Sequence, residues 1–173
     1  NGGGADNVMS AVLSGDSHIG FCGPEAALYV LIGGSNDVPK VFGQLTKRDG
    51  CFLIGRTPEP NFSWDNLRGK EVIIGRKGGL PAMTFEYIVK NLGLTSSNVT
   101  LRTDVQFPLM APTFDSGEGD YVTLFEPTAT EFVSQGKGYI VASVGEKSGE
   151  VPYTSFIALE SFMDKNAKTI ESL

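Results

Sequence analysis

Short apolar runs alternate with helical patterns along the whole chain. One such run, Val72-Ile73-Ile74, leads through a glycine-rich turn into residues 81–92, whose apolar side chains recur at the spacing of one helix face. Strand-to-helix alternation of this kind is typical of α/β proteins. We therefore predict an α/β fold whose sheets pair mainly in parallel.

Turn-forming residues divide this pattern further. We expect the apolar runs 40–45 and 51–56 to form a hairpin around Lys47-Arg48-Asp49-Gly50, because Asp-Gly between apolar runs favours a tight turn. The Pro-rich stretch 57–61 predicts a crossover between two lobes. A chain of 173 residues is long enough for two small lobes.

Charge limits the kinds of partner that the chain can bind. The sequence has 20 acidic and 14 basic side chains, for a net charge of −6. We expect no nucleic-acid partner, because binding along a phosphate backbone needs a basic surface. No apolar run approaches the roughly 20 residues of a membrane span, so we expect a chain that is at most peripheral to a membrane.

The sequence offers little support for catalysis. It contains no G-x-S-x-G elbow, no P-loop and no His/Cys metal cluster. His18, the only histidine, lies four residues from Cys22, about 13 Å along a strand and too far for a hydrogen bond. We predict that the chain is not an enzyme and uses no cofactor or metal. Cys22 and Cys51 lie in apolar runs typical of buried thiols, although their spacing leaves a disulfide open.

The turn between the strand at 72–74 and the next helix is a candidate ligand site. Its sequence, Gly75-Arg76-Lys77-Gly78-Gly79, places two cations and three glycines at a helix start. First-turn amides lack partners within the helix and carry partial positive charge, so such a turn can cradle an anion. Arg76 and Lys77 could add charge-assisted contacts, or could simply be solvated.

Two further strand-to-helix turns, 21–25 and 125–128, each carry a carboxylate. Glu25 and Glu126 could complement the dipoles of their own helices. Alternatively, they could form a pair of acceptors for the amino or pyrimidine groups of a ligand. Two acids lining the same cleft would make an oxyanion such as nitrate or sulfonate a less attractive ligand, so the ligand class stays open.

An ordered series of short motifs covers essentially the whole chain. The motifs are Met9-Ser10-Ala11-Val12-Leu13-Ser14-Gly15-Asp16, Ile19-Gly20-Phe21, Gly23-Pro24-Glu25, Phe62-Ser63-Trp64-Asp65-Asn66-Leu67-Arg68-Gly69-Lys70, Gly119-Asp120-Tyr121-Val122, Glu126-Pro127 and Val151-Pro152-Tyr153-Thr154-Ser155-Phe156. In this order they resemble extracytoplasmic solute-binding proteins of ABC importers, in particular the nitrate, sulfonate (taurine) and thiamine-pyrimidine binding group.

This resemblance implies a two-lobed α/β fold of the type 2 periplasmic-binding-protein kind, with ligand held between the lobes. Lobe one would comprise residues 1–58 plus 157–173, and lobe two residues 59–156. Members of the family begin with a strand and helix before the Gly-Gly loop and end with a long helical region. Both are missing here, so we expect a fragment in which lobe one is incomplete.

The resemblance also implies a function. We expect the substrate-binding component of an ABC importer, a bacterial extracytoplasmic lipoprotein whose partners are a small-molecule ligand and the permease subunits. The implied ligand-binding residues follow the strands: Cys22, Gly23, Pro24, Glu25, Arg76, Lys77, Gly78, Gly79, Leu80, Pro81, Thr84, Phe125, Glu126 and Thr128. The alternatives on the same fold are a ligand-sensing regulatory domain and a pyrimidine-synthesis enzyme. A regulator would need a DNA-binding segment, and the enzyme more than one histidine.

Overall fold

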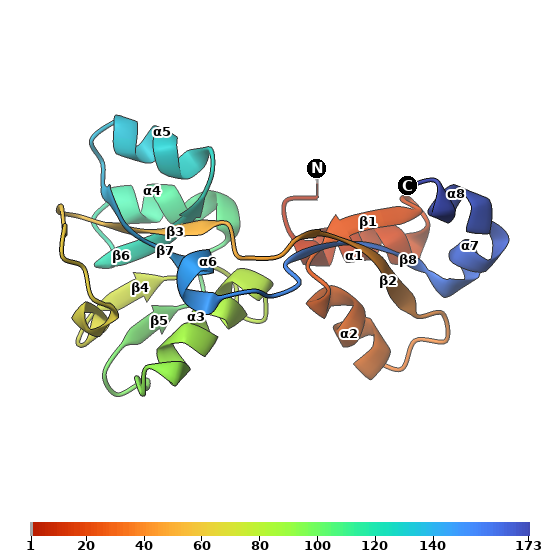
Figure 1. Ribbon diagram of the computed structural model, residues 1–173, viewed down its shortest axis with the longest axis horizontal. Coiled ribbons are helices and arrows are strands. Elements are labelled where there is room, and N and C mark those ends of the chain that lie inside the picture. The colour runs from red at the N-terminus through yellow and green to blue at the C-terminus, as the bar shows by residue number, and fades with distance from the viewer. Residues whose placement is uncertain (1) are drawn as a thin grey trace. The chain divides into compact units, whose positions relative to one another are not determined.

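The protein is described by a computed structural model covering residues 2–173 (Figure 1). The chain folds into two compact units. The first unit comprises Asn1–Lys47 and Pro152–Leu173, and the second unit comprises Arg48–Val151. These bounds differ from the predicted lobes, because the strand Cys51–Gly55 pairs within the second unit. That the units correspond to the two lobes of a binding protein stays a prediction.

The first unit is built on a three-stranded sheet. Its strand order is β1-β8-β2, and both pairings are antiparallel. Two helices supply the core on one face, around Met9, Cys22 and Ile157. The elements of this unit are α1 (Ala5–Ser14), β1 (Ile19–Cys22), α2 (Glu25–Ile32), β2 (Pro39–Thr46), β8 (Thr154–Leu159), α7 (Glu160–Lys165) and α8 (Ala167–Glu171).

The opposite face of the first-unit sheet is aromatic. The Phe156 ring lies 4.9 Å from the Phe21 ring and 6.1 Å from the Phe42 ring, measured between centroids. Phe21 remains 45% exposed. The strand alternation therefore directs small apolar side chains toward α1 and α2, and large rings to the other face.

The second unit is built on a five-stranded sheet of order β5-β4-β6-β3-β7. β4 runs parallel to β5 and β6, whereas β3 runs antiparallel to β6 and β7. The elements are β3 (Cys51–Gly55), η1 (Trp64–Leu67), β4 (Glu71–Ile73), α3 (Leu80–Asn91), β5 (Thr100–Arg102), η2 (Phe107–Leu109), α4 (Met110–Asp115), β6 (Tyr121–Phe125), α5 (Thr128–Ser134), β7 (Tyr139–Ser143) and α6 (Val144–Ser148).

Helices cover both faces of the second-unit sheet. Val72 packs with Phe85 of α3 on one face, whereas the next residue, Ile73, packs with Phe114 of α4 on the other. All four side chains are fully buried. Figure 1 shows α4 and α5 on one side of this sheet and α3 on the other. The predicted α/β fold is thus confirmed as a three-layer arrangement in this unit.

The expectation of mainly parallel sheets is wrong. The first-unit sheet is antiparallel, and the second-unit sheet is mixed, because β3 inserts between β6 and β7 in the opposite direction. Alternation of strand and helix indicates the type of each element, but the direction of pairing depends on which strands become neighbours.

The predicted hairpin is also wrong. β2 pairs with β8 and β3 with β6 and β7, so the two runs belong to different sheets. Asp49 is buried and accepts a hydrogen bond from the backbone N–H of Cys51 at 2.7 Å. This aspartate therefore shapes the entry into β3 rather than a hairpin turn. The chain passes between the units at Lys47–Arg48 and again at Val151–Pro152, whereas residues 57–61 lie within the second unit.

The described part of the chain contains neither a disulfide nor a helix able to span a membrane. Cys22 and Cys51 are buried thiols and form no disulfide. None of the helices found in residues 2–173 combines the length and the apolar character that crossing a bilayer requires.

Candidate functional site

Three strands of the second unit end at one edge of the sheet. β4, β5 and β6 are parallel, so the segments that follow them begin side by side. The backbone N–H of Ile74 donates to the Arg102 carbonyl at 3.0 Å, and that of Lys77 donates to the Thr103 carbonyl at 3.1 Å. Ligands in open α/β sheets bind beyond the carboxyl ends of the strands. This edge is therefore the candidate site.

The predicted strand–turn–helix geometry is present at this edge. Gly75 and Gly78 have φ of +85° and +78°, values that favour glycine. Gly79 is the N-cap residue of α3, and its N–H donates to the Arg76 carbonyl at 3.1 Å. The Arg76 side chain is half-buried and that of Lys77 is exposed. The turn places two cations beside a helix start, although Pro81 removes one N–H donor from the first turn.

Glu126, the carboxylate after β6, serves its own helix. One carboxylate oxygen accepts from the Thr130 backbone N–H at 3.0 Å, and the other accepts from Thr130 Oγ1 at 2.8 Å. These bonds satisfy donors in the first turn of α5. The geometry favours the interpretation of Glu126 as a helix-stabilising residue.

Glu25, the first residue of α2, is turned into the first unit. It is 6% exposed, and its carboxylate lies over Gly23 so closely that any Cβ at Gly23 would collide with it. Burial, and next the charge of Glu25, raise the pKa of the neighbouring Cys22 thiol to about 11. This arrangement gives no support to Glu25 and Glu126 as a pair of ligand acceptors. It removes the reason for ranking oxyanions low.

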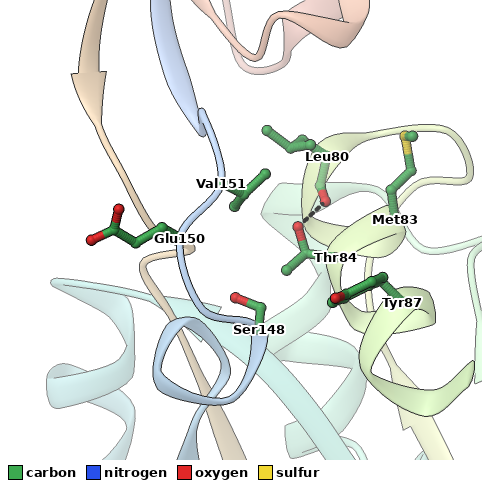
Figure 2. A pocket seen from close by; sticks show the side chains of 7 residues that line it. All are labelled: Leu80, Met83, Thr84, Tyr87, Ser148, Glu150 and Val151. Atoms are coloured by element: carbon green, nitrogen blue, oxygen red, sulfur yellow. Dashed lines mark hydrogen bonds between the residues drawn. The ribbon is translucent and has the colours of Figure 1, made fainter. Parts of the chain in front are cut away.

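A cavity of about 270 Å³ lies beside α3 within the second unit (Figure 2). One wall comes from α3, at positions i, i+3, i+4 and i+7. The other wall is formed by the last residue of α6 and the segment that follows it. The lining residues are Leu80, Met83, Thr84, Tyr87, Ser148, Glu150 and Val151. Leu80 and Thr84 belong to the predicted site, and the other five do not.

The polar atoms of the cavity wall mostly serve the protein itself. Thr84 Oγ1 donates to the Leu80 carbonyl at 2.8 Å, and Ser148 Oγ lies 3.3 Å from the Gly149 carbonyl, to which it donates. Figure 2 shows the Glu150 carboxylate pointing away from α3. The surface that faces the cavity is therefore largely apolar.

Two stacked aromatic rings lie at the same edge of the second-unit sheet as the Gly75–Gly79 turn. Phe107 stacks on Phe125 with the ring centroids 5.2 Å apart and the planes at 28°. Phe107 is 39% exposed and lies near Gly75, where an added Cβ would come within 3.9 Å of its ring. Phe125 was among the predicted residues, whereas Phe107 was not, because no local pattern brings it to the turn.

The predicted residues divide between the two units. Residues 22–25 lie in the first unit, whereas 76–81, Thr84, Phe125, Glu126 and Thr128 lie in the second. The parallel strands bring both second-unit groups to one sheet edge. Ligand binding by these residues stays a prediction.

The fold is that of periplasmic binding proteins. The periplasmic aliphatic sulphonate-binding protein SsuA from Escherichia coli aligns with a TM-score of 0.78 and 16% identity, over 98% of this chain and 57% of that chain. The alkanesulfonate-binding protein SsuA from Xanthomonas axonopodis pv. citri, bound to MOPS, aligns with a TM-score of 0.79 and 15% identity, over the same shares. At these identities the likeness shows the fold.

Sequence comparison supplies the family. The NMT1-like family model matches residues 57–173, so the chain belongs to the NMT1-like family. The Bacillus subtilis (strain 168) protein YtlA, named as a binding protein, is 43% identical over 167 residues, which is 96% of this chain and 50% of YtlA. The chain thus spans about half the length of this curated relative. The resemblance to solute-binding proteins of ABC importers is confirmed, and the relatives named here are binding proteins rather than enzymes.

Proposed function

We propose that the protein is the substrate-binding component of an ABC importer that captures a small anionic solute of the sulfonate or nitrate kind. The observation that carries this proposal is the strand–turn–helix at Gly75–Gly79, which places Arg76 and Lys77 beside the start of α3 in a chain of binding-protein family and fold. Two structural neighbours are sulfonate-binding proteins, which supports this class of solute.

The positions of the two acids favour the anion over an aminopyrimidine. Glu126 is hydrogen-bonded to Thr130, and Glu25 is buried at the start of α2. An aminopyrimidine would need acceptors for its amino group, but the Glu126 carboxylate is already bonded within α5, and the Glu25 carboxylate lies over Gly23 in the first unit. An anion needs positive charge, and the Gly75–Gly79 turn places Arg76 and Lys77 beside the start of α3.

An importer role implies an extracytoplasmic location and a membrane permease as partner. The E. coli neighbour is a periplasmic protein, which supports the location. We propose that the protein acts outside the cytoplasmic membrane, held at the surface by a lipid anchor or confined in a periplasm, and delivers its ligand to permease subunits.

A thermal-shift and calorimetry screen of the full-length protein tests this function. The panel comprises methanesulfonate, taurine, nitrate, bicarbonate, thiamine and its aminopyrimidine precursors. We expect a sulfonate to raise the melting temperature, because a ligand at 100 times its Kd adds about 2.7 kcal/mol to the free energy of unfolding. Binding without chemical change of the ligand supports a transport role, and product formation would contradict it.

Two lysine variants connect the binding to the turn. We expect Lys77→Ala to weaken sulfonate binding roughly fivefold, because it removes one exposed charge next to the site. Lys90→Ala is the matched control, since Lys90 is an exposed lysine in the last turn of α3, far from the Gly75–Gly79 turn at the start of that helix. Equal affinities in the two variants would place the anion elsewhere.

A further inference from the structure

Helix α3 is apolar on two opposite faces. The stripe that faces the sheet is at most 4% exposed and consists of Ala82, Phe85, Ile88 and Val89. Leu80, Met83 and Tyr87 lie about half a turn away around the helix. In this second stripe Met83 is 40% exposed and Tyr87 is 55% exposed. Helices that are apolar on both faces normally bury both, so the second stripe is suited to an occupant of the cavity beside it.

The chemistry of the cavity limits what that occupant can be. The hydroxyl groups of Thr84 and Ser148 donate to backbone carbonyls, and Glu150 points away from α3. A charged group placed here would lose water and meet no side chain of opposite charge that points toward it, and the Tyr87 hydroxyl alone would not offset that loss. The cavity therefore suits an uncharged apolar group, either aryl or short alkyl.

The size and place of the cavity relate it to the Gly75–Gly79 turn. Its volume of about 270 Å³ is just below the range of about 300–1,000 Å³ for whole-ligand pockets, which fits part of a ligand better than a complete one. Leu80 lines the cavity and directly follows Gly79, the last residue of the turn. The cavity thus begins where the cationic turn ends.

We propose that this cavity holds the apolar body of the ligand, while the acid head of the ligand lies at the Gly75–Gly79 turn. This inference rests on the proposed function, because it assumes that the turn binds an anion. The ligand class is then an amphiphilic organic anion with an aryl or short alkyl body. Met83 and Tyr87 become residues that determine specificity, and an inorganic oxyanion would use only half of the site.

A series of anions with one head and different bodies tests this proposal. Calorimetry on the full-length protein would compare sulfate with methane-, butane-, hexane- and benzenesulfonate. We expect the affinity to rise about fourfold for each methylene that enters the cavity, until the cavity is full. Sulfate and methanesulfonate should bind most weakly.

Two tyrosine variants separate the body from the head. Tyr87→Ala should weaken hexanesulfonate binding about tenfold and leave methanesulfonate binding within twofold, because it removes a wall of the cavity and no part of the turn. Tyr139→Ala is the matched control: Tyr139 is 41% exposed, lies on β7 of the same unit and does not line the cavity. It should change neither affinity.

The outcomes separate this proposal from the proposed function. If all the sulfonates bind with equal affinity, the anion site stands and the apolar subsite is overturned. If no anion binds, the proposed function fails and the subsite fails with it. If Tyr87→Ala changes the mass measured by sedimentation but no affinity, the cavity is covered by a second copy of the chain, which also overturns the subsite.

Discussion

The two units differ in how their sheets are covered. The second-unit sheet has a buried cluster on each face, with Ile73 and Val72 both fully buried. The first-unit sheet has one such cluster, around Ile157, and its other face carries the Phe21, Phe42 and Phe156 rings with Phe21 45% exposed. The outer side of α2 is exposed as well, at Leu28, Tyr29, Leu31 and Ile32.

This difference indicates where the stability of the chain resides. A side chain buried between two layers gains the full transfer free energy, whereas a ring on an open face keeps part of its surface in water. The candidate anion turn and the cavity both lie in the second unit, on elements fixed by its core. We expect the second unit to be a rigid support for binding and the first unit to open more readily.

The largest expected effect compares one phenylalanine from each unit. Phe85→Ala should lower the free energy of unfolding by about 3–5 kcal/mol, because Phe85 is fully buried beneath the second-unit sheet. Phe156→Ala should lower it by about 1 kcal/mol, because that ring lies on the open face of β8. Urea unfolding followed by circular dichroism measures both values. Equal losses would show that the first-unit face is as well covered as the second-unit core.

An effect of intermediate size is expected on the pH dependence of the free energy of unfolding, through a buried tyrosine of the second unit. Tyr121 OH donates to a Glu59 carboxylate oxygen at 2.8 Å, and burial, followed by this bond, raises the pKa of Tyr121 above its usual range. A raised pKa in the folded state means that the contribution is complete below the unfolded value of about 10 and is lost as the pH rises further. Tyr121→Phe should cost about 1.5 kcal/mol at pH 8.

Urea titrations between pH 8 and 11 check the sign of this effect. The wild type should lose stability above pH 10 relative to Tyr121→Phe, so that the two curves converge. Tyr139→Phe is the control, since Tyr139 is an exposed tyrosine of the same sheet. A constant difference between wild type and Tyr121→Phe over the whole range would mean that ionisation of Tyr121 does not contribute.

Local signals made much of the second unit predictable. The helix expected at 81–92 is observed as Leu80–Asn91, because its start and stop signals, Pro81 and Gly93, act within one turn of the helix ends. The Gly75–Gly79 turn was found for the same reason. In both cases the physical cause is contained in a few adjacent residues.

Contacts between distant segments could not be predicted in this way. The partners of β2 and β3 are β8 and β6, strands that follow more than 60 residues later, so the Asp49-Gly50 signal suggested the wrong pairing. In the cavity, Met83 and Tyr87 could have been recognised from their helical spacing with Leu80. Ser148 and Val151 could not, because packing of the end of α6 and of the segment after it brings them to α3.

The smallest expected effect uses the two buried thiols as reporters of opening. Cys22 is 7% exposed in the first unit and Cys51 is 2% exposed in the second, so alkylation of either thiol requires local opening. The pKa of about 11 makes the folded Cys22 thiol unreactive at pH 8, which leaves the opened form as the reacting species.

If the first unit opens more readily, iodoacetamide followed by mass spectrometry should label Cys22 roughly tenfold faster than Cys51. A ligand held only by the second unit should slow the labelling of Cys51 more than that of Cys22. Faster labelling of Cys51 would reverse the order of stability that the two sheets indicate.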